Sequence, residues 1–513
     1  MVLRLRPKRI AERPEKVGTA KILLTNRGIK ESDSDHVTAQ QRSFGRLLVG
    51  DIIRLTPGLM AQLVDGFVVN TVLGVYLPPQ AMGLYTLFWL TQAYVADFVT
   101  GWLRTAIIRF LPENPYHLRR FIRFAFITIL VVGALGTLVA VVLAMGQADK
   151  FRWAHLAWTV AIFCGLSFFL TFQCALRGLF EQSHFSASAV LLVLTKVLLL
   201  LVFLPNATDR VATALMAMAL SYVPPLIWQW KRLRQMDKQR ASRDVEKSGD
   251  GPLLRRSLVY GMPLTVSLFI INWLQTGDRY LLATLVDLKE LGIYTFWMGI
   301  GLQMKVYRII FTALGPRLFQ MNQADPARAK HYVQRLIGVY MLIAAPLLTA
   351  LGLLLPPILV WLKINPQYAP ASHLVFYGMG IAFFLGLVQL CGKEREFAEK
   401  TAVFMQAAVP SVLVMVAGVY VLTPLVGLDG AAIATLAGFG LHFFIVAFAA
   451  RTWPTLADVL TSASSSLALF VIYHWAAHTF GSLVGMMAVG LIFSCYGLWT
   501  MRRAWRNRLQ KTG

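Results

Sequence analysis

Charged side chains lie inside long apolar segments of the chain, where each of them is energetically costly. A charge at the centre of a membrane-spanning helix costs about 2.5–3.5 kcal/mol on insertion scales, so it usually faces a bundle interior or a watery cavity. Here the charges gather on four segments, which carry Arg54 and Asp65, Asp97 and Arg104, Asp278 and Arg279, and Lys305 and Arg308. We therefore expect these four segments to line one polar cavity.

The cations of these segments outnumber the anions, which favours an anionic substrate. Lys305 and Arg308 are three residues apart and share one face of a helix. Guanidinium groups offer paired donors that match phosphate and carboxylate oxygens. We predict that a phosphate-bearing substrate contacts the five cations Arg54, Arg104, Arg279, Lys305 and Arg308. The carboxylates of Asp65, Asp97 and Asp278 are candidates for binding a coupling proton or sodium ion.

Each of these residues also has a structural interpretation. Arg54 and Arg308 lie near the predicted membrane boundaries and can extend to the lipid headgroups. Lys196, which stands alone in a fifth segment, either reaches a headgroup or forms a structural ion pair. The three carboxylates either pair with cations for helix assembly or bind the coupling ion. Four aromatic residues of the second segment either stack on a sugar or belong to the core: Tyr85, Phe88, Trp89 and Tyr94.

The composition identifies a polytopic membrane protein. Of 513 residues, 57% are hydrophobic and 14% are charged, and the mean hydropathy is +0.60, whereas soluble domains are about 25% charged. Apolar runs of about 20 residues, enough to cross a bilayer as a helix, recur along the chain. We predict an all-α protein of about fourteen spans at 52–76, 81–108, 121–146, 153–176, 185–205, 209–230, 257–285, 290–315, 333–360, 371–392, 400–422, 428–450, 459–480 and 482–501.

The net charge of +24 follows membrane topology rather than nucleic-acid binding. Most of the 49 Lys and Arg fall in alternate loops and in the two terminal segments. This is the positive-inside bias, which places both termini in the cytoplasm. On that side of the membrane, the basic clusters are attracted to anionic lipids. The cysteines Cys164, Cys174, Cys391 and Cys495 show no CxxC or Cys/His spacing, so we expect no metal site and no cofactor.

A four-residue motif occurs twice and reveals an internal repeat. Residues 83–86 read Gly-Leu-Tyr-Thr, and residues 292–295 read Gly-Ile-Tyr-Thr. Each half contains six predicted spans and so begins and ends on the same side, which makes the repeat parallel. We therefore expect a disordered basic cytosolic tail (1–45), a lobe of spans one to six (46–230), a basic cytosolic linker (231–256), a lobe of spans seven to twelve (257–450), and a final helical hairpin with a basic cytosolic end (451–513).

Three stretches resemble motifs of a known transporter superfamily. Residues 77–110, which include Gly83-Leu84-Tyr85 and the run Gly-Trp-Leu-Arg-Thr-Ala at 101–106, look like the N-half signature of polysaccharide transporters. Residues 278–282 (Asp-Arg-Tyr-Leu-Leu), followed by 292–294, look like their second-half signature. Residues 424–435 resemble the turn between their eleventh and twelfth spans. The chain is thus similar to the multidrug/oligosaccharidyl-lipid/polysaccharide exporter superfamily, near the O-antigen, exopolysaccharide and lipid II flippases.

This resemblance implies a function and a location. It implies two six-helix lobes that work by alternating access in the bacterial cytoplasmic (inner) membrane. The cargo implied is a polyprenyl-pyrophosphate-linked oligosaccharide, moved to the outer leaflet for O-antigen, capsule or exopolysaccharide biosynthesis. The implied partners are this glycolipid, membrane lipids and polysaccharide assembly proteins, with no nucleic acid. Cationic residues of spans one, two, seven and eight are what such flippases use for the pyrophosphate.

Two other functions compete with this one. A multidrug/cation antiporter of the same superfamily should have an acidic cavity, whereas the cations predominate here. A membrane polysaccharide polymerase or ligase should carry a catalytic domain outside the membrane, but the predicted outer loops are short. We therefore expect a transporter and not an enzyme.

Overall fold

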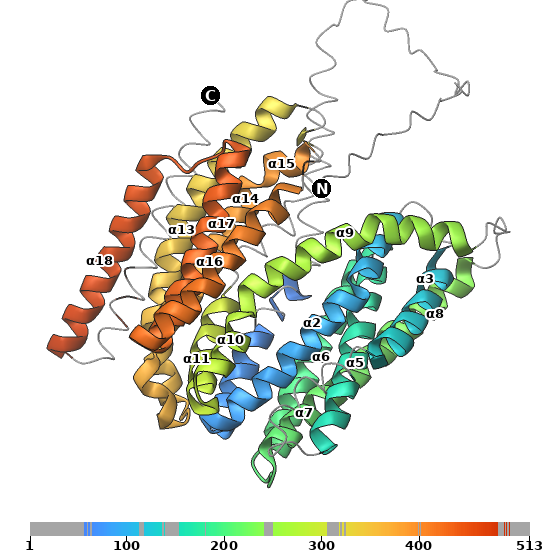
Figure 1. Ribbon diagram of the computed structural model, residues 1–513, viewed down its shortest axis with the longest axis horizontal. Coiled ribbons are helices and arrows are strands. Elements are labelled where there is room, and N and C mark those ends of the chain that lie inside the picture. Colours follow the sequence, from blue (N-terminus) through green and yellow to red (C-terminus); the bar gives the residue numbers. More distant parts are fainter. Residues whose placement is uncertain are drawn as a thin grey trace, which may run out of the picture. The chain divides into compact units, whose positions relative to one another are not determined.

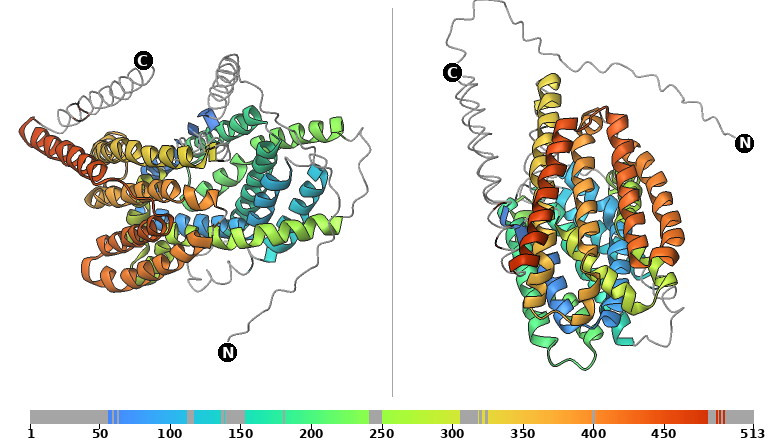
Figure 2. Two further views of the ribbon diagram at one scale, coloured as in Figure 1. Left: turned by 90° about the horizontal axis from the view of Figure 1, so that it is seen from above. Right: turned by 90° about the vertical axis from the view of Figure 1, so that its left-hand side faces the viewer.

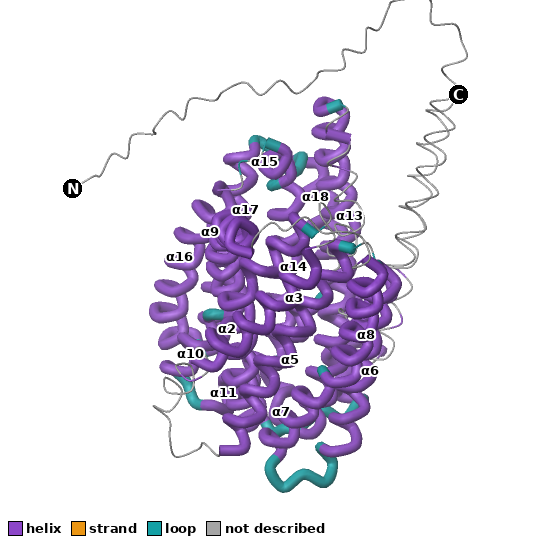
Figure 3. Tube along the Cα trace, turned by 90° about the vertical axis from the view of Figure 1, so that its right-hand side faces the viewer, coloured by secondary structure: helices purple, strands orange, loops and turns teal. Residues whose placement is uncertain are grey.

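The computed structural model separates residues Met1–Gly50 from the unit Asp51–Gly513. The residues that the structure describes all lie in this unit and are 56–58, 60–61, 64–111, 117–135, 138, 153–179, 181–240, 250–304, 318, 321–322, 325–398, 400, 402–480, 487, 489 and 492. Their regular elements are all helices, joined by short loops (Figure 3). The predicted cytosolic tail 1–45 and the basic residues after 501 lie outside the described ranges.

The helices follow one another with few residues between them. In the first half they are an apolar helix over Val64–Tyr76, α2 (Pro79–Phe110), α3 (Leu118–Ile127), the π-helix η2 (Thr128–Val132), α5 (Trp153–Gly178), α6 (Gln182–Phe203), α7 (Arg210–Ser221) and α8 (Val223–Arg240). In the second half they are α9 (Asp250–Thr276), α10 (Asp278–Leu285), α11 (Leu288–Gln303), α13 (Pro326–Trp361), the 3-10 helix η4 (Pro366–Ala371), α14 (Leu374–Cys391), α15 (Lys393–Phe397), α16 (Ala402–Val426), α17 (Leu428–Ala450) and α18 (Leu456–Phe480).

The helices of this unit pack as two bundles that follow the two halves of the sequence. In the first half, α5 contacts α2, α7 and α8, and α6 contacts α7 and α8. In the second half, α14 packs between α11, α13 and α17, while α18 lies against α13. Figure 1 shows the first bundle in blue to green and the second in yellow to red, and the views of Figure 2 show α13 to α18 running side by side. Helix α2 joins the bundles because it also contacts α9 and α11.

The predicted all-α polytopic architecture is confirmed. Nine helices of the described part are long and apolar enough to cross a membrane. The 32-residue helix α2 is long enough but is not among them, because polar residues recur along it. The count of about fourteen stays a prediction, since 52–55, 139–152, 305–317 and 493–501 lie outside the described ranges. The predicted linker 231–256 is helical at both ends, with α8 reaching Arg240 and α9 starting at Asp250.

The repeated glycines hold the two halves in contact. Gly83 of α2 lies directly against the carbonyl of Leu288 and close to the backbone nitrogen of Gly292. Gly292 of α11 lies equally close to the carbonyl of Pro79. A Cβ at either position would overlap these backbone atoms, and small residues allow helix backbones this close approach. The motif that marks the sequence repeat is therefore the place where the two repeats meet.

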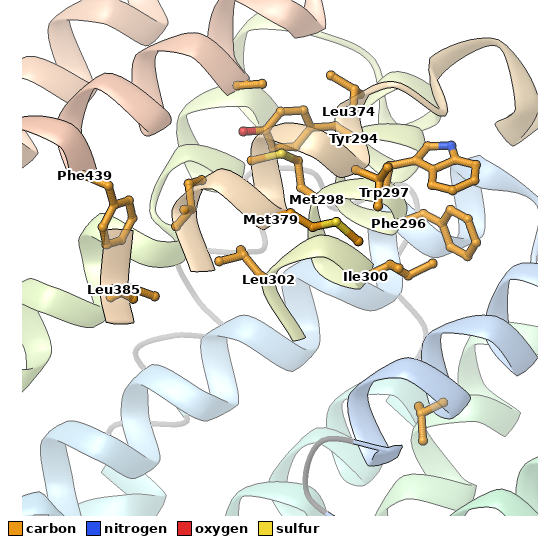
Figure 4. Close-up of a cluster of buried hydrophobic side chains, with 14 of the residues drawn as sticks. Tyr294, Phe296, Trp297, Met298, Ile300, Leu302, Leu374, Met379, Leu385 and Phe439 are labelled. Atoms are coloured by element: carbon orange, nitrogen blue, oxygen red, sulfur yellow. The ribbon is translucent and has the colours of Figure 1, made fainter. Parts of the chain in front are cut away.

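Further contacts fasten the same end of the bundle, which we call the Pro78 end. Trp297 of α11 donates to the carbonyl of Tyr368 at 2.7 Å, and the Tyr368 hydroxyl donates to the carbonyl of Leu77 at 3.1 Å. These residues adjoin the apolar core in which side chains of α11, α14 and α17 interdigitate, including Trp297, Met379 and Phe439 (Figure 4). The Pro78 end is thus joined across the halves by both apolar packing and hydrogen bonds.

A second seam between the halves runs along the opposite part of α2. Gly101 of α2 lies against Thr265 of α9, and Gly261 of α9 lies against the backbone of Trp102. Together with the contact at Gly83, this seam brings α2 against the second half both near its start and near its end. The space between the two contacts is where a cavity lies.

Replacing Gly292 by alanine should destabilise the protein by about 1–3 kcal/mol, the usual cost of overpacking a close contact. The added Cβ meets the Pro79 carbonyl, which belongs to the backbone and cannot rotate away. Thermal unfolding of the purified protein in detergent measures the effect. Gly251→Ala is the matched control, because a Cβ at Gly251 meets no atom within 4 Å. Equal unfolding temperatures for the two variants would contradict the close contact.

Candidate functional site

A cavity of about 290 Å³ lies between the two halves. It is walled by the Val64–Tyr76 helix, α2, α6 and α7 of the first half and by α9, α10 and α11 of the second. The lining residues are Asp65, Gly66, Val69, Asn70, Tyr85, Thr86, Trp89, Leu90, Ala93, Tyr94, Asp97, Lys196, Met218, Asn272, Gln275, Thr276, Arg279, Thr295, Gly299, Leu302 and Gln303. Most of these walls come from the four segments in which the sequence carries buried charge.

A second cavity of about 240 Å³ adjoins the first and shares Asp97 and Asn272 with it. It follows the seam between α2 and α9 and is lined by Gly101, Arg104, Thr105, Ile108, Cys174, Thr265, Leu268 and Phe269 as well. The two spaces together extend along α2 from Tyr85 to Ile108. Open space thus follows the interface of the halves over much of the length of this helix.

One face of α2 supplies a row of cavity residues at helical spacing. Tyr85, Trp89, Ala93 and Asp97 are four residues apart and all line the larger cavity. Side chains at i and i+4 lie on the same face of a helix, so this row points into the space between the halves. The opposite side of α2 packs on α5 of its own bundle.

Asp65 forms an ion pair with Lys196 of α6 at the cavity wall. The Lys196 ammonium donates to both carboxylate oxygens, at 2.8 and 2.7 Å. Lys196 is 3% exposed, whereas Asp65 is 26% exposed. The carboxylate therefore faces the cavity while its cation lies behind it. Of the two interpretations of Lys196, the structure shows the ion pair.

Asp97 accepts hydrogen bonds from both halves. Arg104, two turns further along α2, donates to one carboxylate oxygen at 2.5 Å. Asn272 of α9 donates to the other at 2.8 Å. One turn earlier, the Tyr94 hydroxyl lies 2.5 Å from the Thr276 hydroxyl of α9. These polar contacts cross the seam between α2 and α9, and they hold the two helices together beside the cavity.

Asp278 and Arg279 form a buried network at the start of α10. One carboxylate oxygen of Asp278 accepts from the backbone nitrogen of Arg279 at 2.9 Å and from its guanidinium at 3.2 Å. The other accepts from the hydroxyls of Tyr294 at 2.5 Å and Thr435 at 3.0 Å. Adjacent residues on a helix rarely pair, but here Asp278 lies in the first turn of α10 and its side chain folds back. Asp278 is thereby saturated with donors, and it holds Arg279 at the edge of the cavity.

The predicted site residues fall into four groups. Asp65, Asp97 and Arg279 line the larger cavity, Arg104 lines the adjoining one, and Asp278 lies behind Arg279. Arg54, Lys305 and Arg308 lie outside the described residues. These last three carry the excess of cations that the sequence predicts. In the described lining of the larger cavity, two carboxylates, Asp65 and Asp97, accompany two cations, Lys196 and Arg279.

Sequence reasoning did not assign several polar residues of the cavity to the site. The threonines at the last position of each repeated motif, Thr86 and Thr295, both line it, as do Asn70, Gln275 and Gln303. The repeated motif could have predicted the two threonines, because the motifs contact each other at their glycines and the threonines follow three residues later. The need of Asp65 for a cation could have pointed to Lys196, the one charge of its segment. That the segment of Lys196 packs against the segment of Asp65 could not have been predicted, since 131 positions separate the two residues.

Comparison with known protein families gives a match over more than half of the chain. The family model described as "Polysaccharide biosynthesis protein" matches residues 51–322. Comparison with curated protein sequences gives no match.

Solved structures of transporters are similar in fold. Lipid II flippase MurJ in an inward closed conformation superposes with a TM-score of 0.67 and 10% identity, covering 88% of this chain and 99% of the flippase. A mutant of the Vibrio cholerae MATE transporter VcmN superposes with a TM-score of 0.54 and 13% identity, covering 80% of this chain and 97% of that one. An outward-facing multidrug resistance MATE family transporter of the MOP superfamily gives a TM-score of 0.54 and 14% identity, covering 81% and 96%.

Replacing Lys196 by methionine should lower the free energy of unfolding by about 3–5 kcal/mol, because it leaves Asp65 without its cation. Adding Asp65→Asn to Lys196→Met should restore part of the loss. The measurement is a double-mutant cycle of chemical unfolding in detergent. Lys289→Met, at an exposed position, is the control and should change stability by less than about 0.5 kcal/mol. Strictly additive losses for the two substitutions would contradict the ion pair.

Proposed function

Because the chain belongs to the polysaccharide biosynthesis protein family, we propose that it is a flippase for a lipid-linked oligosaccharide. It moves a polyprenyl-pyrophosphate-linked oligosaccharide from the cytoplasmic to the outer leaflet of a bacterial inner membrane, for O-antigen, capsule or exopolysaccharide biosynthesis. The observation that carries the proposal is the polar cavity between two apolar helical bundles. The fold shared with a lipid II flippase supports it.

The cavity solves the physical problem that such a substrate poses. A pyrophosphate with its sugars cannot cross hydrocarbon unaided, whereas the polyprenyl tail has no reason to leave it. A polar cavity that opens to either side in turn carries the head group across while the tail stays in the lipid. Helix pairs that separate alternately at the Pro78 end and at the seam of Gly101 and Gly261 would supply this alternating access.

The cations are assigned to the pyrophosphate. Arg279 is held at the cavity edge by Asp278, and Arg104 lines the adjoining cavity. Arg54, Lys305 and Arg308 belong to the same spans and supply the additional positive charge. We assign proton or sodium coupling to Asp65 and Asp97, whose carboxylates line the cavity. Asp278 serves as a positioning residue, because its four accepted hydrogen bonds leave it no free lone pair toward a cation.

A cation antiporter is the second candidate. Two observations favour it: the carboxylates of Asp65 and Asp97 are more exposed than their cation partners, and the fold is shared with multidrug transporters. A strain without the protein would then be hypersensitive to cationic drugs and would have a normal pool of lipid-linked glycans. If the protein is a flippase, the strain should instead have normal sensitivity to cationic drugs and an enlarged pool of lipid-linked glycans.

A strain lacking the protein should accumulate a complete polyprenyl-linked oligosaccharide and lose the corresponding surface polymer. Lipid extraction with mass spectrometry identifies the accumulated glycan. Wild-type protein should restore the polymer, whereas Arg279→Gln and the double substitution Lys305→Ala with Arg308→Ala should not. The control Arg328→Gln, at an exposed position, should restore it. Membrane levels of each variant are compared by immunoblot, and an unchanged lipid pool in the deletion strain would exclude the proposed cargo.

Both termini should lie in the cytoplasm, because the basic residues follow the positive-inside rule. Fusions of a green fluorescent protein to either end should fluoresce. Fusions of alkaline phosphatase, which is active only outside the cytoplasm, should be inactive at both ends. Phosphatase activity at one end would contradict the even number of spans, and activity at both ends would reverse the assigned orientation.

A further inference from the structure

Trp89 is the aromatic residue of α2 that remains free to face a ligand. Phe88 is buried, and its ring lies 5.7 Å from the ring of His155. Tyr94 is held by Thr276 and the carbonyl of Asn272. Trp89 is half-buried and lines the larger cavity, and no ring of the described residues packs on its indole. Tyr85 also lines the cavity, but its side chain is buried. Of the four aromatic residues that the sequence proposes for sugar stacking, the structure therefore selects Trp89.

The cavity continues beyond Trp89 along the same face of α2. Ala93 follows one turn later, and Asp97 follows one turn after that. Because residue 93 is alanine, only a methyl group stands between the Trp89 and Asp97 positions on this face of the helix. An indole face beside a hydrogen-bond acceptor suits a sugar ring, whose C–H face is apolar and whose edge carries hydroxyls.

The ion pairs of the cavity present acceptors rather than cations. The side chains of Asp65 and Asp97 are 26% and 30% exposed, while those of their partners Lys196 and Arg104 are 3% and 18% exposed. Directly beside Asp65 or Asp97 a phosphate would lie close to carboxylate oxygens, which disfavours it there, whereas Arg279 lines the same cavity from α10. Sugar hydroxyls, in contrast, are donors for these oxygens, and the cations behind them neutralise the carboxylate charge.

A neutral ligand would also satisfy a buried hydroxyl of the cavity. The Thr295 hydroxyl is buried and lines the cavity, and it has no hydrogen-bond partner among the described residues. A buried polar group without a partner is unfavourable, so a ligand hydroxyl at this point adds a missing bond. The side-chain amides of Asn70 and Gln303, which carry both donors and acceptors, line the same space. Amides and hydroxyls of this kind distinguish ligands by hydrogen bonding rather than by charge.

From these observations we propose that the larger cavity binds an uncharged sugar ring of the head group. Trp89 packs on the face of the ring, and Asp65 and Asp97 accept hydrogen bonds from its hydroxyls. The subsite therefore selects a neutral hexose or N-acetylhexosamine next to the pyrophosphate and rejects a uronic acid. A cavity of about 290 Å³ is at the small end of ligand sites, so it holds the sugar nearest the lipid and not a long glycan. This inference rests on the proposed function and specifies its substrate.

Binding of three synthetic lipids to the purified protein, measured by native mass spectrometry, tests the subsite. All three carry the same short polyprenyl chain: one ends in the pyrophosphate alone, one adds N-acetylglucosamine, and one adds glucuronic acid. For the wild-type protein, the neutral sugar should tighten binding about tenfold over the pyrophosphate alone, which corresponds to about 1.4 kcal/mol. The uronic acid should not tighten it.

Two substitutions separate stacking from charge. Trp89→Ala should remove the gain from the neutral sugar and leave binding of the sugar-free lipid unchanged. Asp97→Asn keeps the size of the side chain but removes its charge, so it should raise the relative affinity for the uronic acid. Trp361→Ala is the matched control, because Trp361 of α13 is 79% exposed and does not line either cavity; it should behave as wild type.

The outcomes distinguish the subsite from the function on which it rests. If the sugar-free lipid binds but the neutral sugar adds nothing, or if Trp89→Ala keeps the full gain, the sugar subsite is overturned and the flippase function stands. If the uronic acid binds as tightly as the neutral sugar, the assigned selectivity is wrong. If none of the three lipids binds to the wild-type protein, the proposed function itself is contradicted.

Discussion

The need to neutralise charge inside an apolar bundle constrains the whole interior of this protein. Three carboxylates of the described residues lie at the cavity or directly behind its wall, and each is held by a cation: Asp65 by Lys196, Asp97 by Arg104 and Asp278 by Arg279. Breaking such a pair by removing one partner leaves a buried charge without compensation, which is far more costly than losing an exposed pair. The Asp65–Lys196 pair joins the first helix to α6. The same carboxylates join other helices through hydrogen bonds, since Asp97 of α2 accepts from Asn272 of α9 and Asp278 of α10 accepts from Tyr294 of α11 and Thr435 of α17. The pairs also decide the chemistry of the cavity, because two of the carboxylates face it while their cations are more deeply buried.

Because of the internal repeat, equivalent helices of the two halves face each other across the cavity. The repeated glycines, Gly83 and Gly292, bring the second helix of one half against the corresponding helix of the other. Three residues further along, Thr86 and Thr295 line the cavity from opposite halves. A single short motif thus serves both as the contact that closes the Pro78 end and as part of the cavity wall. Movement at this contact would change access to the cavity and the position of its hydroxyls together.

Much of the fold could be predicted from the sequence, because long apolar segments in a membrane leave few alternatives to helices. The buried charges also identified the helices that line the cavity. The side chains that face the cavity could not be predicted, since they depend on pairs between distant helices. Asp65 and Lys196 illustrate this point: each looks like an isolated charge in the sequence, and only packing of the first helix against α6 shows that they are one unit. In the same way, Phe88 and Trp89 are neighbours of similar type, and their burial alone separates a core residue from a cavity residue.

In the mechanism proposed for this protein, the polar head group of a lipid-linked glycan crosses the membrane through the cavity between the halves. The most direct test is an experimental structure of the full chain with a short-chain polyprenyl pyrophosphate that carries N-acetylglucosamine. We expect the sugar against Trp89 and beside Asp65 and Asp97, with the pyrophosphate near Arg279 and the polyprenyl chain outside the bundle. A head group bound elsewhere on the protein, with the cavity holding only water, would contradict it.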